Sequence, residues 1–182
     1  IDTVGLGQNF SHLSELSSTI RGTKILTEPP EVERVLATAK ASAVNLVQEK
    51  LTDRYETLRD YNVAAGEKLA EPYRMLYVSN FPNGFNARSV EMLASIISSS
   101  RRTGISVFMT VDEAELADRR GAERALLEDP LVETLQPSGL LRSESHGLVA
   151  EHFHYVPEDG ISETYKQLID DVNAATKAHQ SR

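Results

Sequence analysis

Two short apolar segments with one amphipathic helix between them limit the fold of this chain more than any other feature. Residues 73–79 (YRMLYVS) and 105–111 (ISVFMTV) are rich in β-branched and aromatic side chains, which is typical of strands. Residues 87–100 between them have apolar side chains at helical spacing, and Asn86 is a favourable N-cap. This order predicts a parallel pair of strands, because a parallel connection needs a crossover. We expect the first strand to be buried on both faces except at Arg74.

The chain of 182 residues has the size of one ordinary domain. We expect a single α/β domain or domain fragment over 1–182, with a mainly parallel core sheet and its strand–helix–strand core at 73–127. Before this core, apolar residues recur every three or four positions from 31 to 62, which predicts a long helical insertion over 31–66. The other expected elements are a strand at 1–6, a helix at 8–20, a short strand at 24–26, an acidic helix at 112–127, antiparallel strands at 140–141 and 147–155, and a closing helix at 161–178.

The charge of the chain is uneven, with a net value of −8. Residues 1–124 carry 15 basic and 17 acidic side chains, whereas residues 125–182 carry 4 basic and 10 acidic ones. Residues 131–182 are therefore expected to form an acidic C-terminal edge. Free-standing nucleic-acid binders usually have a basic surplus, because phosphate neutralisation supplies most of their affinity. A DNA contact here would need a local patch or neighbouring subunits.

The composition excludes several classes of site. Cysteine is absent, which removes disulfides, thiolate zinc sites, iron–sulfur clusters and cysteine nucleophiles. No apolar run approaches the roughly 18 residues of a membrane-spanning helix, so we expect no membrane segment. No secretory signal opens the sequence, and Ile1 in place of Met suggests a processed or excised segment. We expect a cytoplasmic protein.

The sequence offers weak candidates for metal binding and for hydrolysis. His152 and His154 would share one face of a strand, with His146 nearby, but Glu151 would point to the other face. Paired histidines on an exposed strand are the simpler interpretation, and we assign no metal site. The serines lack the G-x-S-x-G context of a nucleophile elbow, so we assign no catalytic residue.

A glycine-containing loop near the start of the chain invites comparison with phosphate-binding loops. Gly5 and Gly7 flank one leucine, but no third glycine follows at dinucleotide spacing, and G-x-x-x-x-G-K-[ST] does not occur. The spacing favours an ordinary turn. We expect that the chain alone does not bind ATP.

Asn80 follows the first apolar strand, where open α/β sheets place ligand-binding groups. In nucleotide hydrolases an acidic pair at this position holds Mg²⁺ and polarises water. Asn80 and Phe81 occupy the two positions here, and neither is a carboxylate. Arg101 and Arg102, at the end of the following helix, complement its dipole. A contact with phosphate or with a neighbouring subunit is the alternative role for this pair.

Four segments of the chain follow one another in this order: VGLGQNF at 4–10, TEPPEVERVL at 27–36, YNVAAGEKLAEPYRMLYVSNFPNGF at 61–85 and MLASIISSSRRTGISVFMTVDE at 92–113. In this order they resemble the middle and end of an FtsK/HerA-type P-loop ATPase domain. The resemblance covers most of the chain, and its weight rests on the order and spacing of the segments, since no single motif is diagnostic. The closing NAATKAHQSR at 173–182 is similar as well.

The resemblance implies a RecA-like half in which residues 75–79 form the Walker B strand and residues 105–111 form the sensor strand. Asn80, Phe81 and Thr110 would then lie near the nucleotide. ATP and Mg²⁺ are the cofactors of the family. Two departures limit the transfer of function: the Walker A segment is missing, and the Walker B acids are replaced.

These observations lead to two functional hypotheses. The first is a fragment or degenerate domain of an FtsK/HerA-like DNA-translocating or DNA-processing ATPase, with a degenerate Walker B motif, which is catalytically incomplete alone. Its partners would be the remainder of its own polypeptide or neighbouring subunits of an oligomer, with DNA bound through the assembly. The second is a non-enzymatic interaction or oligomerisation module that uses the helix at 31–62 as its partner face. A long helix that lies across its own domain is the simpler interpretation of that pattern.

Overall fold

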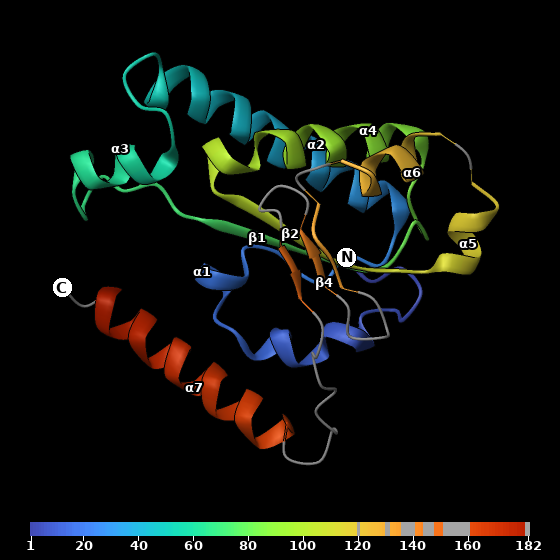
Figure 1. Cartoon of the computed structure of the whole chain (residues 1–182). Helices are drawn as coiled ribbons and strands as arrows, with labels where there is room; N and C mark the ends of the chain where they lie inside the picture. Colours follow the sequence, from blue (N-terminus) through green and yellow to red (C-terminus); the bar gives the residue numbers. More distant parts are fainter. Residues whose placement is uncertain (120, 130–131, 136–140, 144–147, 151–160, 181–182) are drawn as a thin grey trace.

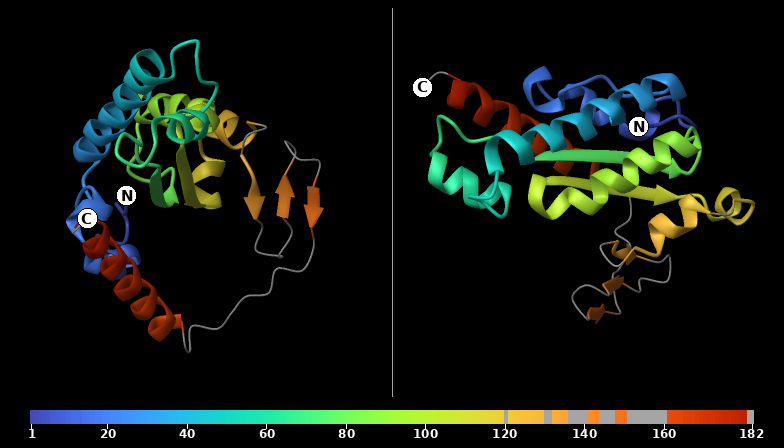
Figure 2. Two further views of the ribbon diagram at one scale, coloured as in Figure 1. Left: turned by 90° about the vertical axis from the view of Figure 1, so that its left-hand side faces the viewer. Right: turned by 90° about the horizontal axis from the view of Figure 1, so that it is seen from above.

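A computed structural model describes most of the chain as a mixed α/β structure (Figure 1). Two parallel strands lie at its centre, with helices packed on one side of them and a long C-terminal helix on the other side, and a small antiparallel sheet lies beside the parallel pair (Figure 2). The described residues are 1–119, 121–129, 132–135, 141–143, 148–150 and 161–180.

The expected strand–helix–strand core is confirmed. β1 (Arg74–Phe81) and β2 (Ile105–Val111) pair in parallel, from Arg74 opposite Ile105 to Val78 opposite Met109, and α4 (Ala87–Thr103) connects them. α4 begins at the predicted cap: the Ser89 amide donates to the Asn86 side-chain oxygen at 2.9 Å, and the Asn86 amide donates to the Ser89 hydroxyl at 2.8 Å. This reciprocal capping box satisfies amides that a helix start otherwise leaves unpaired.

The main hydrophobic core lies between β1, α4 and α2 (Pro29–Asn45). α2 packs along α4, and Pro29 and Pro30 fit the first turn of a helix. The side chains that fill this core are almost completely shielded from solvent, among them Val32, Leu36, Val78, Phe81, Val90, Leu93 and Ile96.

The expectation of one continuous helix from 31 to 62 is wrong. α2 passes into a π-helical segment, η2 (Leu46–Leu51), and the chain then turns at Thr52, which has a φ of 47°. A new helix, α3 (Leu58–Ala65), begins at a capping box. The apolar side chains recur as the sequence predicts. Those in the second half of the segment pack against one another, because the chain folds back and buries Leu46, Leu51 and Leu58 together.

The expectation that β1 is buried on both faces is also wrong. Helices cover one face, and on the other face Met75 is 65% exposed and Phe108 of β2 is 52% exposed. Within the described residues the parallel sheet has two strands, and no wider RecA-like sheet is formed. An apolar sequence therefore marked a strand correctly but overestimated how much of it is covered.

The N-terminal segment forms no strand, and its helical region is irregular. The carbonyl of Ile1 and its ammonium group bond to β1, and a turn over residues 3–7 follows. The predicted helix at 8–20 is split into a 3₁₀ helix, η1 (Gln8–Glu15), and one turn of α-helix, α1 (Ser18–Arg21), because Leu16 is extended. No strand forms at 24–26, although Leu26 is buried in the core.

The C-terminal part contains antiparallel strands near the predicted positions and the predicted closing helix; residues 140, 147 and 151–155 of the predicted strands lie outside the described residues. β3 (Thr134–Leu135), β4 (Leu141–Ser143) and β5 (Leu148–Ala150) form a separate antiparallel sheet, and α7 (Ile161–Gln180) contacts η1. The expected acidic helix is two shorter helices, α5 (Glu113–Ala117) and α6 (Ala122–Leu127), interrupted by Gly121 with a φ of 115°. No helix in the described residues combines the length and the apolar character needed to cross a membrane.

Candidate functional site

The carboxyl ends of β1 and β2 bring two of the predicted site residues into contact. The Asn80 amide donates a hydrogen bond to the Thr110 hydroxyl oxygen at 2.9 Å. Asn80 has a φ of 55°, a left-handed conformation that asparagine adopts more readily than most residues, and the strand register shifts here between Val78 and Phe81. This bond uses the backbone amide of Asn80, so the side-chain amide group, which can both donate and accept hydrogen bonds, takes no part in this contact.

Phe81, the other predicted position on β1, belongs to the core. Its side chain is 0% exposed, and its ring packs edge-on against that of Phe85 with centroids 5.2 Å apart. Phe81 therefore contributes to the packing of the main core.

A carboxylate that sequence reasoning did not single out lies beside these strand ends. The Asp112 amide donates to the Phe81 carbonyl at 2.7 Å, which fixes Asp112 next to β1. Its side chain caps α5 by accepting from the amides of Ala114 and Glu115, and its second oxygen accepts from the Asn83 side chain at 3.3 Å. The sequence does contain a signal for this residue, because an aspartate directly after a strand and before an acidic helix is a favourable N-cap.

The glycine loop near the N-terminus wraps an internal carboxylate. Asp2 is 0% exposed, and it accepts hydrogen bonds from the Gly5 amide at 2.9 Å and from the Asn9 amide at 3.0 Å. The Asn9 side chain donates both to Asp2 and to the Ser79 hydroxyl of β1. A Cβ on Gly5 would lie 2.7 Å from the Asp2 carboxylate oxygens, so this approach needs glycine. The loop is therefore a turn whose backbone amides donate hydrogen bonds to the side chain of Asp2, a residue of the same chain.

The arginine pair lies away from Asn80 and Thr110. Arg101 and Arg102 are in the last turn of α4, which leads into the start of β2, whereas Asn80 and Thr110 lie at the other ends of the strands. Both arginines are exposed, and Arg102 donates to the Glu56 carbonyl at 3.2 Å. The structure therefore does not bring this pair to the strand-end site.

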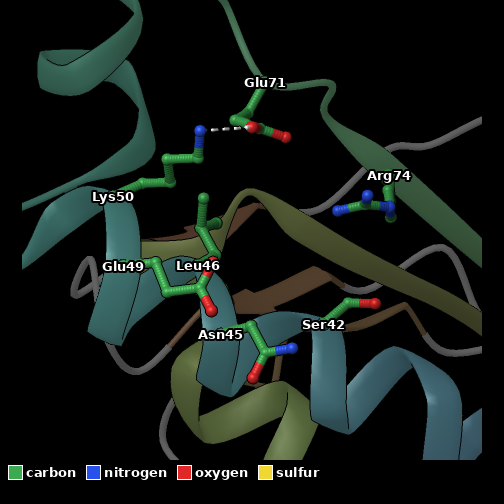
Figure 3. Close-up of a pocket in the computed structure, with 7 residues that line it drawn as sticks. All are labelled: Ser42, Asn45, Leu46, Glu49, Lys50, Glu71 and Arg74. Carbon is green, nitrogen blue, oxygen red and sulfur yellow. Dashed lines mark ion pairs between the residues drawn. The ribbon is translucent and has the colours of Figure 1, made fainter.

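A separate open cavity of about 190 Å³ lies between α2, η2 and the segment that enters β1 (Figure 3). Its lining is mostly polar, and Lys50 forms an ion pair with Glu71 across it at 3.6 Å. No group of three or more histidine, aspartate or glutamate side chains in the described part of the chain is arranged to hold a metal ion. His146, Glu151, His152 and His154 lie outside the described residues.

Comparisons of the chain with protein-family models, with curated proteins and with solved structures give no match.

As the first residue of the 182-residue chain, Ile1 carries a buried ammonium group, which gives a protein of these 182 residues a specific pH dependence. Burial lowers its pKa below the usual 8.0, and the neighbouring Asp2 carboxylate opposes this in part. Below the folded pKa the group is charged in both states, so the cost of burying the charge is fully present, and above 8.0 that cost is absent. We therefore expect the free energy of unfolding to rise with pH across this window.

Nα-acetylation tests this expectation, because it removes the charge and keeps an N–H that can donate to the Tyr77 carbonyl. The acetylated chain should be more stable than the free amine at low pH, and the difference should shrink as pH rises through the window. Urea unfolding of both forms between about pH 5 and pH 9 measures it, since groups shared by the two forms cancel. A stability difference that stays constant with pH would contradict the assignment.

Proposed function

We propose that this chain is part of an FtsK/HerA-type DNA-translocating or DNA-processing ATPase, in which it supplies the strand ends beside the nucleotide. The observation that carries the proposal is the hydrogen bond between the Asn80 amide and the Thr110 hydroxyl at the carboxyl ends of adjacent parallel strands. In open α/β sheets this edge is where ligands bind. The residues at the Walker B and sensor positions of the resemblance are thus neighbours in space.

The chemistry of these residues supports a role in positioning, with hydrolysis dependent on groups from elsewhere. The side chain of Asn80 can hydrogen-bond a phosphate oxygen or a water molecule, but an amide cannot take up a proton as a general base. Thr110 offers a hydroxyl that already accepts the Asn80 amide. ATP and Mg²⁺ would be held chiefly by a phosphate loop in the remainder of the polypeptide or in a neighbouring subunit, and DNA would be contacted through the assembly.

The alternative of an interaction module built on the helix at 31–62 has less support. The apolar side chains that would form its partner face are directed into the chain's own core at Val32, Leu36, Leu46, Leu51 and Leu58, each of which is buried. A partner would meet the polar side of these helices, so we do not propose this segment as the docking face.

The proposal predicts that Asn80 contributes to nucleotide affinity in the protein encoded by the complete reading frame. Replacing Asn80 by alanine should weaken ATP–Mg²⁺ binding about tenfold, which corresponds to the loss of about one hydrogen bond. Ser98→Ala, at an exposed position of α4, is the matched control and should leave the affinity unchanged. Calorimetric titration measures both variants. Equal affinities for Asn80→Ala and the unaltered protein would remove Asn80 from the nucleotide site.

A further inference from the structure

The turn after β1 contains the dipeptide Asn83-Gly84, the one place in the sequence where glycine follows asparagine. The Phe85 amide donates to the Pro82 carbonyl at 3.1 Å. Asn83 and Gly84 are therefore the two central residues of a β-turn, and Gly84 has a φ of 77°, as the third residue of a type II turn requires. Both residues are half-buried, so solvent reaches the turn.

The backbone nitrogen of Gly84 is accessible to the side chain of Asn83. Among the residues that the structure describes, the Gly84 amide donates to no acceptor, whereas the amides of Asn83 and Phe85 on either side of it are bonded. Glycine has no Cβ that would hinder the approach of a neighbouring side chain to its nitrogen. Every other asparagine of the chain is followed by a residue that does carry a Cβ.

The side chain of Asn83 also connects this turn to the end of β2. It donates to the Asp112 carboxylate at 3.3 Å, and Asp112 directly follows β2 and caps α5. The distance is long for an N–H···O hydrogen bond, so the contact restrains the Asn83 side chain only weakly. A change in the charge of this side chain would act directly on Asp112.

We propose that Asn83-Gly84 is a site of spontaneous chemical modification, at which asparagine, a thermolabile residue, becomes aspartate or isoaspartate and the turn loses its contact with Asp112. The Gly84 nitrogen attacks the side-chain carbonyl carbon of Asn83 and gives up its proton to solvent. A C–N bond forms in a cyclic imide, and the bond from this carbon to the side-chain nitrogen breaks and releases ammonia. Water then opens the imide at either carbonyl and leaves one new carboxylate.

The new carboxylate replaces a hydrogen-bond donor opposite Asp112 by a second negative charge. Like charges at this separation repel each other. The other oxygen of Asp112 accepts from the amides of Ala114 and Glu115, so the cap of α5 should remain while the contact with the turn is lost. The proposal is independent of the ATPase assignment, because the reaction needs only this dipeptide and water.

Peptide mapping by mass spectrometry tests the proposal on the folded 182-residue chain, incubated at mildly alkaline pH. Asn83 should gain the mass difference between an amide and an acid, while Asn80 and Asn86, in the same segment, retain their amides. Asn83→Gln is the matched control, because it keeps the amide group but would have to close a larger, less favourable ring. Conversion of Asn83 no faster than that of Asn80 and Asn86 would overturn the proposal.

A second measurement tests the effect on Asp112. Asn83→Asp carries the converted side chain from the start, and its urea unfolding midpoint at neutral pH should lie below that of the unaltered chain. Adding Asp112→Asn restores one amide and one carboxylate to the pair, and it should recover most of the loss, since asparagine also caps helices well. An Asn83→Asp midpoint equal to that of the unaltered chain, or no recovery in the double variant, would overturn the proposed loss of contact.

Discussion

Replacement of Phe81 by alanine is expected to lower the free energy of unfolding by about 3–5 kcal/mol, the usual cost of deleting a buried aromatic ring. Phe81 is 0% exposed, and its ring packs against Phe85 within the core formed by β1, α4 and α2. The loss combines the transfer free energy of the ring with the cavity that remains, because neighbouring side chains relax only in part. Urea unfolding followed by circular dichroism measures the change.

Phe108→Ala is the matched control, because it deletes the same ring from the adjacent strand at a position that is 52% exposed. Its cost should stay near 1 kcal/mol or below, as expected for a surface ring that leaves no cavity. If the two substitutions cost the same, the account of Phe81 as a core residue is wrong.

Replacement of Asp2 by alanine is expected to lower the free energy of unfolding by about 2–4 kcal/mol. The Asp2 carboxylate accepts three hydrogen bonds, from the Gly5 amide and from the amide and side chain of Asn9, in a site shielded from solvent. Without the Asp2 carboxylate these donors have no acceptor. The turn that connects the N-terminal segment to Ser79 of β1 then loses the hydrogen bonds that hold it together. Thermal or urea unfolding measures the loss.

Asp60→Ala provides the comparison for this substitution. Asp60 also accepts hydrogen bonds, from Thr57 in the capping box of α3, but it is exposed to solvent. Water can replace its bonds, so its removal should cost only about 1 kcal/mol, as for other helix caps. A loss at Asp2 no larger than that at Asp60 would contradict the account of the glycine loop as a turn built on a buried anion.

Local patterns in the sequence predicted the centre of the fold. β1, β2 and α4 follow from apolar runs, helical spacing and the Asn86 cap, all of which operate within a few residues. The contact between Asn80 and Thr110 was also predictable in outline, because the carboxyl ends of adjacent parallel strands meet at one edge.

The remaining features depend on contacts between distant parts of the chain. The helical periodicity from 31 to 62 continues through the turn at Thr52, because both halves bury their apolar side chains and periodicity does not record a change of direction. The exposure of Met75 depends on which elements cover the sheet. The burial of Asp2 depends on Asn9, which also bonds to Ser79, seventy residues further along the chain. No local motif indicates this contact.

The central functional claim is most directly tested by calorimetric titration with ATP–Mg²⁺ of two proteins, the 182-residue chain and the product of the complete reading frame that encodes it. We predict no binding heat from the 182-residue chain and micromolar binding by the longer protein, because in the proposed function the strand ends of β1 and β2 act together with a phosphate loop from elsewhere. Micromolar binding by the 182-residue chain alone, or no binding by the longer protein, would contradict the account.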